Sequence, residues 1–400
     1  MAKRLSLVVK PPANEREIRR LSDLIFQSFC ESDWPPELAD WWLKHIGREN
    51  LRVAKRGRHI IGGLGILYFR QWFGGRSIDS AGISAVAVLP EARGCGAGTQ
   101  MMRTVVEELH ARSVPLSSLY PSTYPLYRAA GYEPAGEYLT CELEVRHLGV
   151  EDRSCVIRPM TDADREAVYA LHRAYGCRSA GVVDRTPRQW SRIFDFGTDR
   201  VYAYVVQAPD KAGGIEGYVV YTQRPVPGEP YEIMVRDHAF LTPAAGRRLL
   251  TFFTDHGTMA RKVIYHGAHR DPLLALARLE TRRVRSSHFW MLRVIDAQRA
   301  LRGRGYPVGV EAELHLEISD DLLPQNSGRF VLHISNGTAR VRKGGRGRLK
   351  LDIRAMAALF SGHLSTVQLA SIGMAEGGAN DLALASTVFA GPPPWMNDDF

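Results

Sequence analysis

One short segment constrains this chain more than any other. Residues 86–102, VAVLPEARGCGAGTQMM, join an apolar strand to a helix through a loop that contains Gly94, Gly96 and Gly98. Glycine is favoured where the backbone takes positive φ or passes close to another group. The first N–H groups of a helix have no partner within the helix, so such a loop forms a site for an anion. The segment therefore predicts an anion-binding turn between a strand and a helix.

Three kinds of anion-binding loop have this general form. A Walker loop ends in Gly-Lys-Ser/Thr, and this loop contains no lysine. A dinucleotide-binding loop needs a third glycine where Thr99 stands, and a parallel βαβ unit. The preceding segments, 51–75 and 77–90, are instead typical of antiparallel strands. The pattern that fits is Arg-x-x-Gly-x-Gly after a Val-x-Val strand, and a purely structural turn rarely needs three glycines.

This pattern resembles the acetyl-CoA pyrophosphate loop of the GNAT N-acetyltransferases. The resemblance implies that acetyl-CoA is the co-substrate and that Arg93 lends positive charge to the pyrophosphate site. Ser122 and Thr123 fall where the family contacts the cofactor again. The implied cofactor-binding residues on the strand and loop are Val86, Ala87, Val88, Arg93, Gly94, Cys95, Gly96, Ala97, Gly98 and Thr99.

The chain repeats the opening of its first part once. SCVIRPMTDADREAVYALHRAYG begins a second strand–helix unit, but TPAAGRRLLTFFTDHG follows no Arg-x-x-Gly-x-Gly pattern. From Met291 the pattern changes: MLRVIDAQRALRGRGY is predicted to be helical, and strand-like segments and further helices follow. We expect an active GNAT domain at 1–152, a degenerate GNAT domain at 153–290, and a third domain at 291–400.

Three further segments extend the resemblance over essentially all 400 residues. LYRAAGYEPA, FWMLRVIDAQRAL and the terminal aromatic residue after two aspartates resemble segments of the Eis-like (enhanced intracellular survival) acetyltransferases. That family combines tandem GNAT domains with a domain like sterol carrier protein 2. The resemblance implies an α/β (α+β) fold with mixed, mostly antiparallel sheets. It also implies a homohexamer.

The resemblance also implies the catalytic residues. Tyr127 matches the proton donor of the family, whereas Tyr120, Tyr124 and Tyr132 are more typical of packing. The C-terminal carboxylate, here on Phe400, matches the general base. For a cationic substrate of the aminoglycoside or polyamine type, carboxylates and aromatics in FQSFCESDW (residues 26–34), with Asp398 and Asp399, are candidates.

Composition limits the remaining classes of protein. Five cysteines without CxxC spacing indicate reduced thiols, and the HxxH of His266 and His269 has no acidic or thiol partner at metal spacing. No apolar run is long enough for a membrane span and the N-terminus is not a signal peptide, so we expect a cytoplasmic protein. The net charge is +9, but the basic run 340–350 has no aromatic residues to stack bases and is predicted to be a solvated hairpin tip. We therefore expect no metal, no membrane and no nucleic acid.

The sequence thus predicts an N-acetyltransferase that acts on primary amines of a cationic small molecule through a ternary complex. Two alternatives stay open: acetylation of protein lysines, and a non-catalytic protein that senses CoA and carries a lipid in its third domain.

Overall fold

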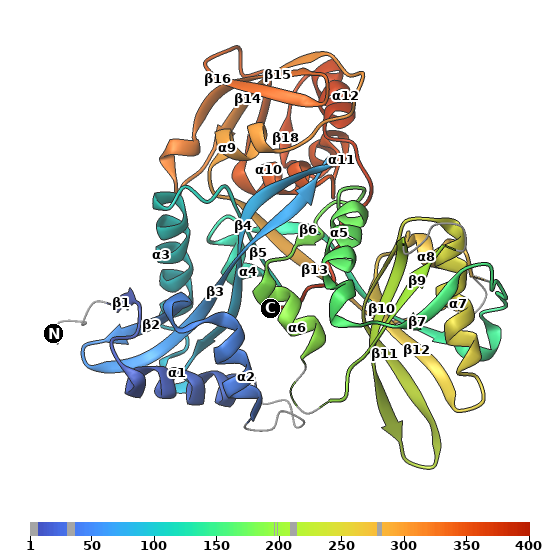
Figure 1. The fold of residues 1–400 in the computed structure, drawn as a ribbon. Coiled ribbons are helices and arrows are strands. Elements are labelled where there is room, and N and C mark those ends of the chain that lie inside the picture. Colours follow the sequence, from blue (N-terminus) through green and yellow to red (C-terminus); the bar gives the residue numbers. More distant parts are fainter. Residues whose placement is uncertain (1–6, 30–36, 196, 198, 209–213, 278–281) are drawn as a thin grey trace. The chain divides into compact units, whose positions relative to one another are not determined.

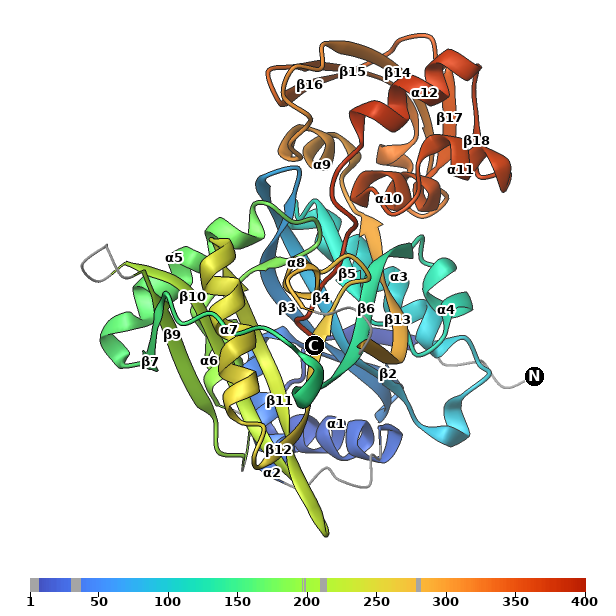
Figure 2. The ribbon, with the colours of Figure 1, turned by 90° about the vertical axis from the view of Figure 1, so that its right-hand side faces the viewer.

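A computed structural model describes residues 7–29, 37–195, 197, 199–208, 214–277 and 282–400. The chain forms two compact units (Figure 1, Figure 2). Unit 1 comprises residues 1–136, 289–392 and 398–400, and unit 2 comprises residues 137–288 and 393–397. No helix in the described ranges is both long enough and apolar enough to cross a membrane.

The first part of unit 1 contains the strands β1-β2-β3-β4-β5-β13 in that spatial order. All neighbouring pairs are antiparallel except β4 and β5, which are parallel. The chain leaves unit 1 within β6 and returns to it within β13. The elements are β1 (Leu7–Lys10), α1 (Glu15–Ser28), α2 (Glu37–Ile46), β2 (Leu51–Arg56), β3 (His59–Phe73), β4 (Arg76–Val88), α3 (Ala97–Ala111), β5 (Leu116–Leu119), α4 (Tyr124–Arg128), β6 (Glu133–Glu144) and β13 (Arg282–Val294).

Helices pack on both faces of β3 because its side chains alternate between the faces. Leu64 lies in a buried cluster with the apolar side chains of α3. On the other face, a Cβ on Gly63 would lie 2.4 Å from the side chain of Leu21 in α1, and a Cβ on Gly65 would lie 3.1 Å from that of Ile46 in α2. The glycines of β3 therefore allow α1 and α2 to pack directly against the strand.

Residues 291–294 are strand, so the helix predicted for MLRV is wrong. These four residues are fully buried and pair antiparallel with residues 119–116 of β5. The buried guanidinium of Arg293 donates hydrogen bonds of 2.8 and 2.7 Å to the two carboxylate oxygens of Asp320. A short apolar run does not distinguish a buried strand from a buried helix. The helix begins only at Ala297, with Asp296 as its N-cap.

The last part of unit 1 is a five-stranded sheet in the order β16-β15-β14-β17-β18. Its strands β14 and β17 are parallel, and the other neighbouring pairs are antiparallel. The elements are α9 (Ala297–Gly303), β14 (Ala312–Ser319), β15 (Gly328–Ser335), β16 (Thr338–Lys343), β17 (Leu349–Asp352), α10 (Ile353–Ser361), α11 (Thr366–Ser371), β18 (Ala375–Glu376) and α12 (Ala379–Val388).

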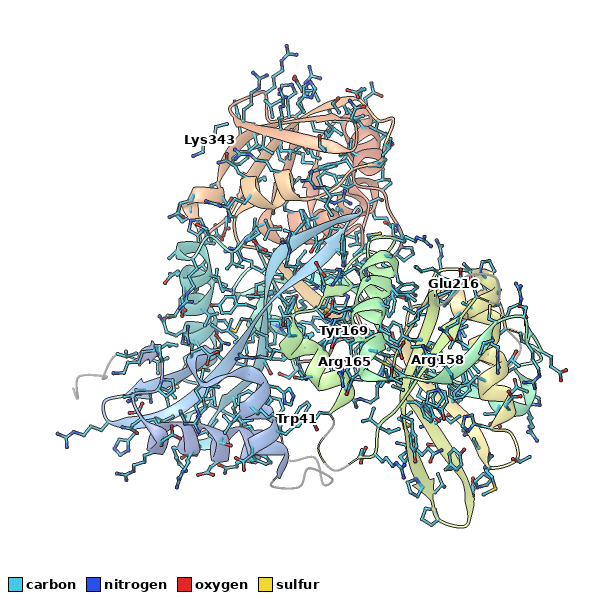
Figure 3. All side chains as sticks on the ribbon, viewed as in Figure 1. Trp41, Arg158, Arg165, Tyr169, Glu216 and Lys343 are labelled. Carbon is cyan, nitrogen blue, oxygen red and sulfur yellow. The ribbon has the colours of Figure 1, made fainter. Side chains whose placement is uncertain are left out.

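The basic run 340–350 is not a hairpin tip. Strand β16 pairs with β15, whereas β17 pairs in parallel with β14, so residues 344–348 connect two strands that are not neighbours. A parallel pair cannot be closed by a tight turn, and a crossover is needed. The predicted exposure of the run is correct at Lys343, which is exposed at the end of β16 (Figure 3).

Unit 2 repeats the strand pattern of the first part of unit 1. Its strands lie in the order β6-β12-β11-β10-β9-β7, with one parallel pair, β11 and β12. Tyr169 of α5 stacks on Trp190 of α6 with ring centroids 4.4 Å apart (Figure 3 labels Tyr169). The further elements are β7 (Val156–Pro159), α5 (Arg165–Gly176), β8 (Val183–Asp184), α6 (Pro187–Phe194), β9 (Tyr202–Gln207), β10 (Ile215–Val226), β11 (Glu229–Phe240), α7 (Pro243–Asp255), β12 (Ala260–Gly267) and α8 (Pro272–Ala275).

The tail segment 393–397 is anchored within unit 2. The backbone N–H of Trp395 donates to the carbonyl of Ala180 over 2.9 Å, and that of Glu137 donates to the carbonyl of Pro394 over 2.9 Å. The amide of Asn397 donates to Asp237 over 3.0 Å, and Asp237 forms a buried ion pair with Arg185. The tail is therefore held by hydrogen bonds and by burial of the Trp395 ring.

Candidate active site

The loop between β4 and α3 has the backbone that its glycines predict. Gly94 has φ +73° and Gly96, the N-cap of α3, has φ +80°. A Cβ built on either glycine would meet no atom within 4 Å, so the space around the loop is open. Gly96 caps the helix without a side chain, and no acidic residue stands in the first turn. The free N–H groups at this helix end therefore favour an anion.

A pocket of about 590 Å³ lies along this loop and the end of β4. All the cofactor-binding residues expected from the sequence line it, except Cys95. The lining residues are Ser28, Phe29, Val86, Ala87, Val88, Ala92, Arg93, Gly94, Gly96, Ala97, Gly98, Thr99, Ser122, Thr123 and Leu126.

Four of these lining residues were not among the expected cofactor-binding residues. Ser28 and Phe29 lie at the end of α1 and reach the pocket because that helix packs on the sheet. Both fall in the segment 26–34, whose aromatics were considered for substrate binding. Ala92 and Leu126 stand beside or within segments that the sequence did single out. Leu126 of α4 packs against the loop, since a Cβ on Gly98 would lie 3.2 Å from its side chain.

The end of β4 is open towards β5. The two strands pair only over residues 80–82 and 116–118, so in the described part of the chain β4 continues to Val88 without a strand on that side. A bulge lies in the same stretch: Ser84 pairs with Gly65 and Ala87 pairs with Gly63. Ala85 takes φ +51° within this bulge. A bulge of this kind removes backbone groups from the ladder and turns them in a new direction.

Cys95 lies outside the pocket lining and is exposed. Its sulfur donates to the carbonyl of Ala92 over 2.7 Å and accepts a hydrogen bond of 2.9 Å from Nη2 of Arg56, at the end of β2. This hydrogen bond from Arg56 lowers the pKa of the Cys95 thiol below its ordinary value of 9.0. The thiolate is the reactive form of cysteine, so Cys95 is activated towards electrophiles.

Tyr127 lies in α4 and is 3% exposed. Its ring packs edge-on against that of Tyr132, with centroids 6.4 Å apart. Burial raises the pKa of Tyr127 above its ordinary value of 10.0, and a hydrogen bond with Ser122 offsets part of this effect. Ser122 lines the pocket, so Tyr127 interacts with a residue of the pocket wall. The phenol keeps its proton at neutral pH.

Phe400 lies where β4 and β5 separate. Its ring lies 5.2 Å from that of Phe69 and 5.7 Å from that of Tyr120, measured between centroids. A Cβ on Gly82 would lie 2.6 Å from the Phe400 ring, and Gly82 pairs with Ser118 in the last parallel pair of the two strands. The last residue of the chain is therefore packed at the mouth of the strand opening.

Not every predicted site residue can be placed. Glu31 and Asp33, from the segment 26–34 that was considered for substrate binding, lie outside the described residues. Asp398 is buried and Asp399 is exposed. Among the described residues, no group of three His, Cys, Asp or Glu side chains is arranged to hold a metal ion.

The corresponding place in unit 2 contains buried side chains. Strands β11 and β12 stop pairing after Val235 and Tyr265. Beyond that point a Cβ on Gly267 would lie 2.7 Å from Oδ2 of Asp271 and 2.9 Å from the ring of Tyr265. The ring of His238 lies 5.8 Å from that of Tyr265. Because these side chains converge there and no glycine loop precedes α7, the described part of unit 2 lacks the features of the site in unit 1.

A strand opening beside a glycine loop and a helix N-terminus defines a GNAT-type acyltransferase site. Residues 11–135 and residues 181–294 each match a family described as acetyltransferase (GNAT) domain, and residues 297–397 match the sterol carrier protein domain family. The match of the second domain therefore ends at 294 and that of the third begins at 297. The expected boundaries at 152/153 and 290/291 stay predictions.

Relatives match over most of the chain. An uncharacterized N-acetyltransferase of Streptomyces griseus is 31% identical over 352 residues, which cover 82% of this chain and 83% of the relative. A GCN5-related N-acetyltransferase from Anabaena variabilis has a solved structure that is 34% identical, with a TM-score of 0.92 over 99% of this chain and 100% of that one. Eis1 from Mycobacterium abscessus, 21% identical, shares the fold with a TM-score of 0.79 over 99% of this chain and 100% of its own.

The chain belongs to the GNAT N-acetyltransferases. It has the Eis-like arrangement of two GNAT domains followed by a sterol carrier protein domain, and it is an N-acetyltransferase. The family and the fold class expected from the sequence are therefore confirmed.

Proposed function

We propose that unit 1 transfers an acetyl group from acetyl-CoA to a primary amine of a cationic small molecule of the aminoglycoside or polyamine type. One observation carries the proposal: the pocket joins the glycine loop to the open end of β4. The N–H groups of the loop suit phosphates, and the open edge of the strand suits a chain with amide groups. CoA carries phosphates and an amide-containing pantetheine arm, so the backbone groups of this site fit CoA.

The backbone of this chain holds the cofactor. N–H groups of the loop from Arg93 to Thr99 bind the diphosphate, supported by the dipole of α3. Within the segment Val86, Ala87 and Val88, the backbone groups that face the open side of β4, away from β3, bind the pantetheine amides. Ser122 and Thr123 contact the cofactor from the other side of the pocket. When bound, acetyl-CoA supplies an acetyl thioester.

Two groups of unit 1 act on the developing charges. A backbone N–H in the bulge at Ala85 donates to the carbonyl oxygen that becomes negative during transfer, because it is not used in the ladder with β3. Tyr127 holds a proton and delivers it to the leaving sulfur. Its raised pKa keeps it protonated, and a thiolate excluded from water accepts a proton readily even from a phenol.

The carboxylate of Phe400 takes the proton from the attacking amine. An ordinary α-carboxylate has a pKa of about 3.3–3.7 and is a weak base. Contacts of the Phe400 ring with the rings of Phe69 and Tyr120 hold this last residue at the strand opening.

The two alternatives differ in their support. A protein lysine would use the same chemistry, so only the choice of amine separates it from a small-molecule substrate. A lipid carried in the third domain is disfavoured, because Arg304 is 2% exposed in the core of that domain and donates to the carbonyls of Phe360 and Phe389 over 2.9 Å each. A buried guanidinium is a poor neighbour for an acyl chain.

The proposed assembly is a homohexamer, which rests on the family resemblance and is tested by light scattering during gel filtration. No step of the proposed reaction uses a metal, a nucleic acid or a membrane. We keep the cytoplasm as the proposed compartment.

A thiol-release assay with a panel of amines tests the proposal. Purified protein is mixed with acetyl-CoA and, in separate wells, polyamines, aminoglycosides and lysine peptides. Release of free CoA with a cationic small molecule, and formation of the N-acetylated product by mass spectrometry, are the expected results. Product on lysine peptides alone would favour protein acetylation. CoA binding without turnover on any amine would favour the sensor.

A further inference from the structure

The turn between β2 and β3 lies beside the glycine loop. Arg56 pairs with His59 across the turn at Gly57, which has φ +61°. Strand β3 then continues along the end of β4: Gly62 pairs with Val88, and the N–H of Leu89 donates to the carbonyl of Ile61 over 2.9 Å. This register places the tip of the hairpin next to residues 90–96.

Arg56 faces the loop with its guanidinium group. Its Nη2 donates to the sulfur of Cys95 over 2.9 Å, and within the described ranges this thiol is the only polar side-chain partner of Arg56. The next residue towards the sheet behaves differently, since Lys55 forms an ion pair with Glu17. A neutral thiol is a weak acceptor, and among the described residues no carboxylate forms an ion pair with Arg56.

The loop itself carries little positive charge. Arg93 is exposed, and its Nε donates to the carbonyl of Val88 over 3.3 Å, so it also lacks a carboxylate partner in the described part of the chain. CoA carries a diphosphate and a 3′-phosphate, which together hold more negative charge than one arginine neutralises. A guanidinium binds a phosphate oxygen far more strongly than a thiol because both partners are charged.

We propose that Arg56 is a phosphate-binding residue of the cofactor site, which exchanges its hydrogen bond with Cys95 for one with a phosphate of CoA. The inference rests on the proposed function, because it needs CoA at the loop. The phosphate is either the 3′-phosphate or the diphosphate, and both present the same chemistry to a guanidinium. Arg56 is not part of the glycine motif and comes from a separate strand.

Binding measurements with three ligands test the inference. Calorimetry compares the wild type with Arg56→Ala for CoA, 3′-dephospho-CoA and pantetheine. We expect the Kd for CoA to rise about tenfold, the order of one charge-assisted hydrogen bond. If Arg56→Ala raises the Kd for CoA but not for 3′-dephospho-CoA, Arg56 binds the 3′-phosphate. If it raises the Kd for both of these ligands but not for pantetheine, Arg56 binds the diphosphate. Both results support the inference.

Two further variants separate a direct contact from indirect effects. Arg58→Ala removes one positive charge from the same turn. Arg58 makes no side-chain hydrogen bond or ion pair within the described residues, so this variant measures how much the positive charge of the turn alone contributes to CoA affinity. Cys95→Ala removes the sulfur that links Arg56 to the loop. We expect both variants to lose less affinity for CoA than Arg56→Ala does. Thermal unfolding of each variant checks that the fold is kept.

Several outcomes would overturn the inference. They are an Arg56→Ala protein that binds CoA like the wild type, an equal loss in Arg58→Ala, an equal loss in Cys95→Ala, and a penalty that remains with pantetheine. The wild type also reports on the proposed function separately. If it bound none of the three ligands, the proposed function would fail and the inference with it, whereas tight wild-type binding with an unaffected variant would reject the inference alone.

Discussion

The ring of Phe400 packs against the ring of Tyr120 with centroids 5.7 Å apart and planes at 60°. Edge-to-face contacts of this kind stabilise aromatic pairs beyond the area that they bury. Tyr120 directly follows β5 and precedes the pocket residues Ser122 and Thr123. The contact therefore places the last residue of the chain beside the segment that forms one wall of the pocket.

A short C-terminal tag is expected to abolish turnover. The tag converts the Phe400 carboxylate into an amide, which cannot accept a proton, while the ring can keep its contacts. Steady-state kinetics on a C-terminally and an N-terminally tagged protein provide the measurement, with CoA affinity as the check on the fold. Equal turnover of the two proteins would show that the base is another group.

Gly82→Ala is expected to lower kcat with little change in CoA affinity. A Cβ at this position would lie 2.6 Å from ring atoms of both Phe400 and Phe69, so at least one ring must move. Gly391→Ala is the matched control, since a Cβ there meets nothing within 4 Å. If Gly82→Ala matched this control in kcat, the packing of Gly82 against the two rings would have no bearing on the reaction.

Tyr127→Phe is expected to reduce kcat by ~10²–10⁴-fold, the range of general acid catalysis, with CoA binding retained. The ring and its packing stay, and only the proton is lost. Because burial raises the pKa of Tyr127 above 10.0, the acid form predominates up to that pH, and the alkaline loss of rate from this group is expected at a higher pH than for an ordinary tyrosine. Tyr124→Phe and Tyr132→Phe are the controls, and a loss in either of them instead would move the role there.

Gly96→Asp is expected to remove CoA binding. The substitution adds a side chain at φ +80° and a negative charge at the N-terminus of α3, where an anion should bind. Calorimetry with acetyl-CoA is the measurement. Unchanged binding, or two CoA sites in each wild-type chain, would contradict the assignment of unit 1 as the one cofactor site.

At a pH near 8, Cys95 is expected to react with iodoacetamide faster than Cys141 and Cys155. Mass spectrometry of the peptides measures the alkylation of each cysteine. The pKa of Cys95 lies below 9.0 because of the hydrogen bond from Arg56, so more thiolate is present at that pH, whereas burial raises the pKa of the other two thiols. Acetyl-CoA should slow the reaction by covering the loop. Arg56→Ala should slow it too, because the pKa of Cys95 then rises. A rate indifferent to both changes would refute this account of the thiol.

The cofactor loop could be predicted because its residues are consecutive. Gly94 and Gly96 stand in one pattern between a strand and a helix, and local backbone requirements are enough to define the turn. The same reasoning failed at residues 291–294, where the choice between strand and helix depended on pairing with β5. It also failed at residues 344–348, because the order of strands in a sheet is not a local property.

Other parts of the site depended on contacts between distant segments. Ser28 and Phe29 reach the pocket through the packing of α1, and the bulge at Ala85 is visible only from the register of β3 and β4. Arg56 meets Cys95 because a hairpin tip lies beside the loop. Apart from Cys95, only Ser28 and Phe29 lie in segments that the sequence marked as candidates.

By itself, the sequence determined the family, the order of the domains, the glycine loop and its place between a strand and a helix. These features follow from consecutive residues, whose backbone preferences and hydrophobic period act over a few positions. Only the tertiary structure decided where the strand opening lies, that the end of α1 reaches the pocket, and that the ring of Phe400 packs on Gly82. These relations come from sheet register and close packing, which join residues that are far apart in the chain.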